Sequence, residues 1–99
     1  MLRQEIKRII KKAVLEANLK EIDFAVERPE DKTYGDYASN AALKLSKILK
    51  MPPMKIAENL RPRILHLGAG LFDKIEIAEP GFINFFISKI YLKNRSEKY

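Results

Sequence analysis

A short apolar segment near the end of the chain, residues 82–87, carries an asparagine among aromatic residues. If it forms a β-strand, alternate side chains point to opposite faces, so Phe82, Asn84 and Phe86 share one face. The other face would carry apolar side chains suited to a core, namely Ile83, Phe85 and Ile87. An unstacked RNA base can stack on an aromatic ring while an asparagine, which has both a donor and an acceptor, bonds to the base edge. The segment therefore predicts a base-binding surface.

A second interpretation of the same segment is purely structural. Strands covered on both faces also appear as continuous apolar runs, so Phe82 and Phe86 could lie under a helix. Asn84 would then satisfy a neighbouring backbone group. On these residues alone the structural interpretation is slightly favoured, and both remain open.

The charge balance of the chain favours a polyanionic partner. Lysine and arginine number 19 against 13 acidic residues, which gives a net charge of +6 at pH 7 and a pI near 9.6. Lys7, Lys11, Lys44 and Lys47 lie on the polar sides of two predicted helices and are candidate contacts to RNA phosphates. A lysine-rich surface that serves only solubility explains the charge equally well.

The residue types argue against catalytic chemistry. The chain has no cysteine and a single histidine, and its acidic residues are scattered over predicted strand and helix surfaces. No nucleophile–base pair and no metal-ligand cluster assembles from them, so we expect no catalytic residue, no metal and no cofactor. Gly68-Ala69-Gly70 is too short for a phosphate-binding loop and follows a predicted helix, which makes it a helix stop.

The chain carries no apolar run long enough for a signal peptide or a membrane span. With no cysteine, it also suits a reducing compartment. We therefore expect a cytoplasmic protein with no membrane partner.

Two helices follow from the hydrophobic pattern. Apolar residues recur at helical spacing over residues 2–17 and again over residues 41–49. Ser39 or Asn40 is expected to cap the second helix. The inner face of that helix is predicted to hold Ala41, Ala42, Leu45, Ile48 and Leu49.

A further helix is expected to begin at Pro53, where the missing N–H of proline costs nothing, and to end at Gly68. Pro62 interrupts its apolar stripe. Since a proline inside a helix removes a hydrogen bond and clashes with the preceding turn, we predict a kink or a break near Arg61.

Two antiparallel hairpins complete the prediction. Residues 22–28 alternate apolar and polar, and residues 36–38 can return beside them. Residues 72–79 and 82–88 form the second pair, joined by a tight turn at Pro80-Gly81. The chain is therefore predicted to be an α+β two-layer domain, with helices packed on a small antiparallel sheet in the order α-β-β-α-α-β-β.

Three motifs occur in a fixed order along the chain: Gly35-Asp36-Tyr37-Ala38-Ser39-Asn40-Ala41-Ala42, Pro53 with Ile56-Ala57, and Pro80-Gly81-Phe82-Ile83-Asn84-Phe85. In order and spacing they resemble the N-terminal additional domain of arginyl-tRNA synthetases, and the likeness covers nearly the whole chain. The last motif is its most specific part. The resemblance implies a two-layer domain that contacts the tRNA elbow at the D-loop. Its base contacts would fall on Phe82 and Asn84, while Phe86 is added from the alternation alone.

The resemblance also implies a division into a domain, residues 1–90, and the start of a connector, residues 91–99. ATP and arginine would bind a catalytic domain of the same ligase, which would be a partner together with arginine-accepting tRNA. The His-x-Gly-His and Lys-Met-Ser-Lys-Ser loops of that catalytic domain are absent here. His66-Leu67-Gly68-Ala69 is similar to the first loop, but Ala69 stands where its second histidine must be. We therefore expect no activity for these residues alone.

Two alternative functions remain open from the sequence. The same surface could belong to a free-standing RNA-binding protein. It could also be a structural module, in which Phe82 and Phe86 contact another protein domain and RNA never approaches.

Overall fold

The computed structural model describes residues 2–91, and its elements follow the predicted order. The α-helices of this part include α1 (Leu2–Glu16), α2 (Ala41–Leu49) and α3 (Pro53–Leu67). The strands are β1 (Val26–Glu27), β2 (Tyr37–Ser39), β3 (Phe72–Ala78) and β4 (Phe82–Ile87), and a short 3₁₀ helix, η1 (Lys32–Tyr34), lies between β1 and β2. The predicted α+β order is confirmed.

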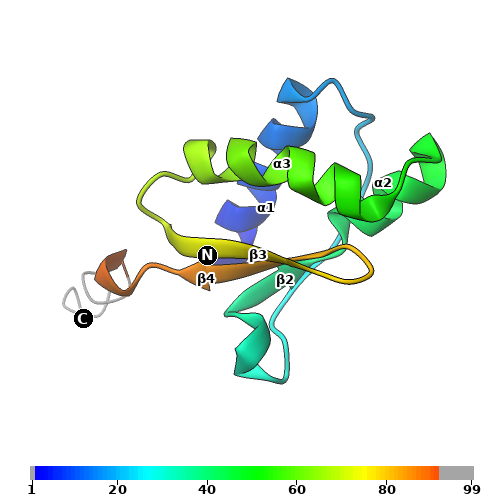
Figure 1. Ribbon diagram of the computed structural model, residues 1–99. Coiled ribbons are helices and arrows are strands. Elements are labelled where there is room, and N and C mark those ends of the chain that lie inside the picture. The colour runs from blue at the N-terminus through cyan, green and yellow to red at the C-terminus, as the bar shows by residue number, and fades with distance from the viewer. Residues whose placement is uncertain (1, 92–99) are drawn as a thin grey trace.

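The strands form one antiparallel sheet in the order β1-β2-β4-β3 (Figure 1). β4 therefore lies inside the sheet, with β2 on one side and β3 on the other. The register places Ala38 opposite Asn84 and Ala78 opposite Phe82. The predicted turn between β3 and β4 is confirmed, with the Gly81 amide donating to the Ala78 carbonyl oxygen at 2.8 Å.

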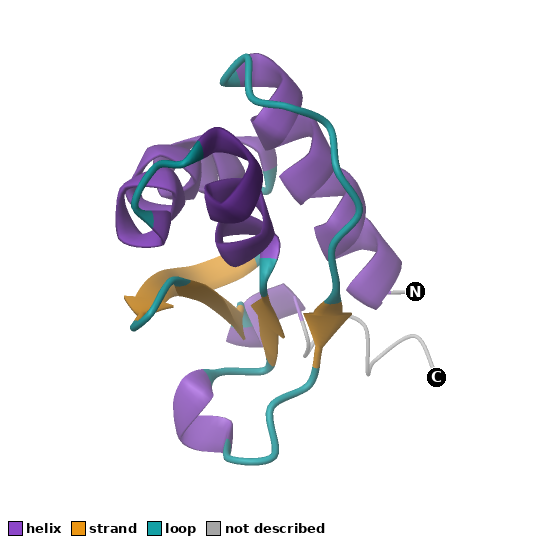
Figure 2. Ribbon diagram, turned by 90° about the vertical axis from the view of Figure 1, so that its right-hand side faces the viewer, coloured by secondary structure: helices purple, strands orange, loops and turns teal. Residues whose placement is uncertain are grey.

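The helices α1, α2 and α3 cover one face of the sheet, and η1 lies beyond the opposite face (Figure 2). The core forms between the helices and the covered face. From β4 it takes Ile83, Phe85 and Ile87, all at most 3% exposed. From the helices it takes side chains such as Ile6, Ile10, Leu45, Leu60 and Ile64. The predicted alternation of β4 is thus confirmed on its core side.

The first predicted hairpin is shorter than expected. Within residues 22–28 only β1, Val26–Glu27, pairs with β2. Residues 22–24 have no strand opposite them, because β2 ends where α2 begins. The Asn40 side chain closes this end, with its Oδ1 accepting from the Ala25 amide at 2.8 Å. Asn40 occupies the N-cap position but makes no side-chain cap bond, while Ser39 Oγ accepts from the Ala41 amide at 3.1 Å.

Of the kink or break predicted near Arg61, the break is wrong, because α3 runs as one helix through Pro62. Pro62 is exposed, so water can solvate the carbonyl that loses its partner, while the opposite stripe is held in the core. The helix begins at Pro53, as predicted, and ends at Leu67 with Gly68 as its C-cap. A Cβ added at Gly81 would lie 2.7 Å from the Pro53 Cβ, so the β3–β4 turn fits against α3 only with glycine there.

The predicted inner face of α2 needs one correction. Ile48 is 46% exposed, whereas Leu49 packs against the core. Leu49 lies one helical turn after the buried Leu45 and continues the same face, whereas Ile48 lies at the edge of that face.

None of the helices described for residues 2–91 has the length and apolar character needed to cross a membrane.

Gly35 is a position where an added side chain would meet the backbone of a neighbouring strand. It has φ +97°, and an added Cβ would lie 2.8 Å from the Phe85 carbonyl oxygen, a backbone atom that cannot move aside. We expect Gly35→Ala to lower the free energy of unfolding by about 2 kcal/mol or more. Gly70 is the matched control, since its φ is +85° and nothing lies within 4 Å of its added Cβ. Gly70→Ala should cost about 1 kcal/mol. Equal losses in urea unfolding would contradict the assigned steric contact.

Candidate nucleic-acid interface

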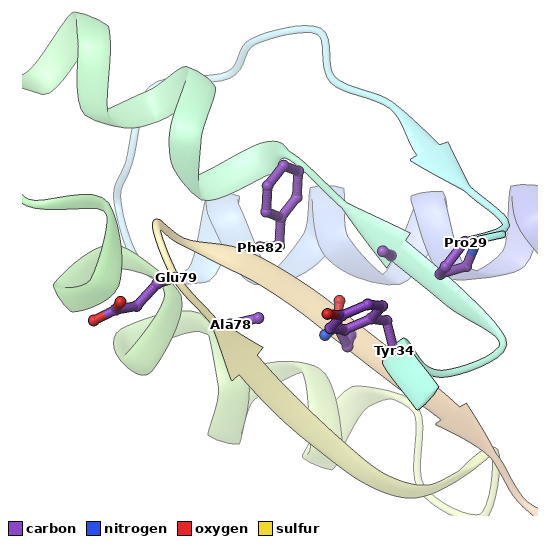
Figure 3. A pocket seen from close by; sticks show the side chains of 7 residues that line it. Pro29, Tyr34, Ala78, Glu79 and Phe82 are labelled. Carbon is purple, nitrogen blue, oxygen red and sulfur yellow. The ribbon is translucent and has the colours of Figure 1, made fainter. Parts of the chain in front are cut away.

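The uncovered face of the sheet carries a hollow of about 320 Å³ (Figure 3). Sites for small ligands have volumes of about 300–1,000 Å³, so the hollow has room for one small group. We call it the sheet hollow, and it is lined by Pro29, Tyr34, Ala38, Ala78, Glu79, Phe82 and Asn84.

Cross-strand pairing gives the sheet hollow its depth. Phe82 and Asn84 lie on β4 with Ala78 and Ala38 opposite them, on β3 and β2. The short alanine side chains leave open space beside the larger ones. Phe82 is 40% exposed, whereas Asn84 is 4% exposed and forms part of the floor.

The Asn84 amide is available to a ligand. Within residues 2–91 no hydrogen bond involves this side chain, and no fully buried side-chain nitrogen or oxygen lacks a partner. Its polar atoms must therefore reach the open space of the sheet hollow. The structural interpretation, with a helix over Phe82 and a backbone group satisfied by Asn84, finds no support in the described chain.

Phe86 lies on the same face of β4 but does not line the sheet hollow. It is half-buried, and the Lys74 Nζ lies 4.5 Å from its ring centroid. Lys74 also pairs with Glu76 at 3.2 Å. The structure therefore brings Phe82 and Asn84 together and places Phe86 beside them under a lysine.

Tyr34 lines the sheet hollow and was not foreseen from the sequence. Tyr34 is 54% exposed and belongs to η1, within the loop that joins β1 to β2. Asp31 caps η1, with its Oδ1 accepting from the Thr33 amide at 2.9 Å and from the Thr33 hydroxyl. The hydrogen bond from the Thr33 hydroxyl, and to a smaller extent the one from the Thr33 amide, holds the pKa of the exposed Asp31 carboxyl below its ordinary value of 3.8. An Asp-x-Thr pattern before a glycine was the signal for this capped turn.

Gly35 and Asp36 fasten the same loop to β4. The Asp36 amide donates to the Phe85 carbonyl oxygen at 2.8 Å. The Ile87 amide donates to Asp36 Oδ2, also at 2.8 Å. The loop that carries Tyr34 is thus anchored to the strand that carries Phe82 and Asn84.

The candidate phosphate contacts lie in the helical layer, apart from the sheet hollow. Lys11, Lys44 and Lys47 are exposed on α1 and α2. Lys7 is half-buried, lies 3.6 Å from an Asp23 carboxylate oxygen, and stands 5.5 Å from the Phe24 ring centroid. Lys7 is therefore already paired within the domain, while the other three have their charges in solvent.

The lining of the sheet hollow suits a neutral flat group. Its side chains are mostly apolar, its single ionisable acid is Glu79, and no lysine or arginine belongs to it. In Figure 3 the Glu79 carboxylate extends away from Tyr34. A phosphate would find no counter-charge here. Residues 2–91 also hold no cluster of histidine, aspartate and glutamate suited to a metal ion.

Comparison with known proteins assigns the chain to a family. A family model described as the arginyl tRNA synthetase N terminal domain matches residues 1–87. The chain is 42% identical over 92 residues to an arginine–tRNA ligase of Shouchella clausii and 38% identical over 94 residues to that of Bacillus subtilis. Each match covers 93% of this chain and 16% of the relative, so the chain spans about one sixth of the length of these ligases.

Solved structures share the fold. The arginyl-tRNA synthetase of Plasmodium falciparum superposes with a TM-score of 0.82 at 22% identity, over 94% of this chain and 17% of that one. The Thermus thermophilus arginyl-tRNA synthetase gives 0.80 at 25% identity, over 97% of this chain and 16% of that one. The two-layer arrangement is thus common to both.

The Asp31 cap should govern the order of η1. The pKa of Asp31 is lower in the folded state than in the unfolded state, so the ionised carboxylate stabilises the folded η1. This stabilisation is complete above the unfolded-state pKa and is lost as the pH falls through the lower folded-state pKa. We expect the Thr33 amide resonance to hold its position down to about pH 4 and to shift below it in an NMR titration. Asp31→Ala should abolish this titration and speed exchange of the Thr33 amide proton. Glu30→Ala, an exposed neighbour, is the control, and equally fast exchange in both variants would contradict the assigned cap.

Proposed function

The chain belongs to the family of arginyl-tRNA synthetase N-terminal domains, and from this premise we propose that it binds the elbow of arginine-accepting tRNA, with the sheet hollow receiving one D-loop base. Phe82 would stack on the base, and the Asn84 amide would bond to its edge. The parent ligase would use this contact to select and orient its tRNA.

One observation carries the proposal: a half-exposed aromatic ring and an unpartnered amide share a hollow on the uncovered sheet face. Burying an amide without a partner costs free energy, and a base edge supplies the missing donor and acceptor. Stacking adds about 1–3 kcal/mol per base. Both contributions require a base that is already unstacked, which loop nucleotides provide.

The role of the contact is affinity and orientation. The chain spans about 16% of the ligases it resembles, and ATP and arginine would bind elsewhere in such an enzyme. A module distant from the chemistry contributes binding energy that fixes where the acceptor end of the tRNA lies. The domain itself would supply no reacting group.

The lysines of the helical layer would contact phosphates. Lys11, Lys44 and Lys47 are exposed and can exchange their counterions for RNA phosphates, while Lys7 would first have to leave Asp23. Such contacts position the RNA without reading its sequence.

The base contact can be tested by tRNA binding at several salt concentrations. We expect Phe82→Ala to weaken binding by about 1–3 kcal/mol. Asn84→Ala should cost about 1 kcal/mol and remove the preference for the native D-loop base over a substituted one. Leu65→Ala is the matched control, because Leu65 is 39% exposed on α3 and Phe82 is 40% exposed. Circular dichroism melts verify folding. If both site variants bind like the control at every salt concentration, the base-contact proposal fails.

The phosphate contacts have a separate signature. For each of Lys11, Lys44 and Lys47 we expect substitution by alanine to reduce the magnitude of the slope of log affinity against log salt by about 1, without changing base preference. Lys7→Ala should change the slope less, because Lys7 is paired with Asp23. Lys20→Ala, an exposed lysine outside α1 and α2, serves as control. Unchanged slopes would remove these lysines from the interface.

A further inference from the structure

Tyr34 and Phe82 reach the sheet hollow from separate parts of the chain. Phe82 belongs to β4, whereas Tyr34 belongs to η1, within the loop that joins β1 to β2. In Figure 3 the two rings stand apart, with the sheet surface between them. The sheet hollow therefore has an aromatic ring on two of its borders.

The position of Tyr34 is fixed without any contribution from its ring. Asp31 caps η1 before the ring, while Gly35 lies against the β4 backbone directly after it. Asp36 adds two hydrogen bonds to β4. The ring itself is 54% exposed and belongs to no core cluster, so the fold holds a large apolar side chain in solvent beside an open hollow.

We propose that Tyr34 is a second stacking residue, which turns the sheet hollow from a one-sided platform into a two-sided clamp for a single neutral base. This inference rests on the proposed base-binding function. Ala38 and Ala78 keep the space between the rings open, and Asn84 lies at the floor, where it meets the edge of an inserted base. Because no cation lines the hollow, the clamp favours the base itself over its phosphate.

The clamp uses the ring of Tyr34 and not its hydroxyl. No hydrogen bond of the hydroxyl holds η1 within the described chain. A phenylalanine would therefore preserve stacking, whereas a leucine would keep an apolar side chain there but lose the π-face. Filling the hollow from the floor, by Ala38→Leu, would exclude the base from between the rings while leaving Tyr34 in place.

The test uses the 99-residue chain and an arginine tRNA transcript, in native form and with the D-loop base removed. With the native transcript, Tyr34→Leu and Ala38→Leu should weaken binding by about five-fold or more, and Tyr34→Phe should bind like the unaltered chain. With the abasic transcript, all of these proteins should bind alike. An Ile48→Ala variant, 46% exposed on α2, controls for loss of a solvent-exposed apolar side chain. Thermal melts verify folding.

The outcomes separate the clamp from the function on which it rests. If Tyr34→Leu binds the native transcript like the unaltered chain while Phe82→Ala still weakens it, the clamp is overturned and the base contact stands. If Phe82→Ala, Asn84→Ala and Tyr34→Leu all bind both transcripts like the unaltered chain, the base contact and the clamp fail together. A loss for Tyr34→Leu that persists with the abasic transcript also overturns the clamp, because the ring would then contact another part of the RNA.

Discussion

The two faces of β4 set the constraint on which the rest of the domain depends. Ile83 and Phe85 are fully buried under the helices, and in a strand their burial dictates where the side chains between them point. Phe82 and Asn84 face the uncovered side for that reason. A shift of one residue in the register would put the amide into the core and expose apolar side chains, at a cost of about 1.5–3 kcal/mol for each large one. The core therefore positions the sheet hollow, even though it contributes no atom to it.

The same strand also positions the loop on its uncovered side. The backbone of Phe85 accepts the Asp36 amide and leaves no room for a side chain at Gly35, while the Ile87 amide donates to the Asp36 carboxylate. Because these contacts involve the backbone of the loop and of β4, the position of the loop does not depend on solvent-exposed side chains. Tyr34 therefore holds its place relative to Asn84 although neither residue is near the other in sequence. The Gly-Asp pair acts as a structural fastener of the site and does not need to touch a ligand.

Periodicity was sufficient to predict the elements, because burial of one face repeats every two or 3.6 residues. It predicted α1, the β3–β4 hairpin and the two faces of β4. The sequence rules failed at positions where tertiary packing decides whether a helix continues or how long a strand is. Pro62 stays inside α3 because its side faces water while the opposite stripe is anchored in the core. The strand at residues 22–28 was predicted from its alternation, yet its length was set by where α2 begins, which alternation does not encode.

The candidate site was predictable only in the part that lies on one strand. Phe82 and Asn84 are linked by a period of two, whereas Tyr34 reaches them through the fold, and no spacing rule connects positions so far apart. Phe86 is the opposite case. The two-residue period of the strand predicts its face correctly, but it does not predict that Lys74 lies over its ring.

The separation of the lysines from the sheet hollow has a physical consequence for recognition. A cation in the hollow would attract any phosphate and blur the distinction between backbone and base. In the proposed interface, attraction by the exposed lysines of α1 and α2 and contact with the base are carried by different surfaces and depend differently on salt. Under the proposed function, the domain would attract RNA by charge and discriminate by the neutral, size-limited sheet hollow, and its ligand would have to be a polynucleotide that reaches both layers at once. A bent, folded RNA with an exposed loop meets that requirement, whereas a straight duplex presents no unstacked base to the hollow.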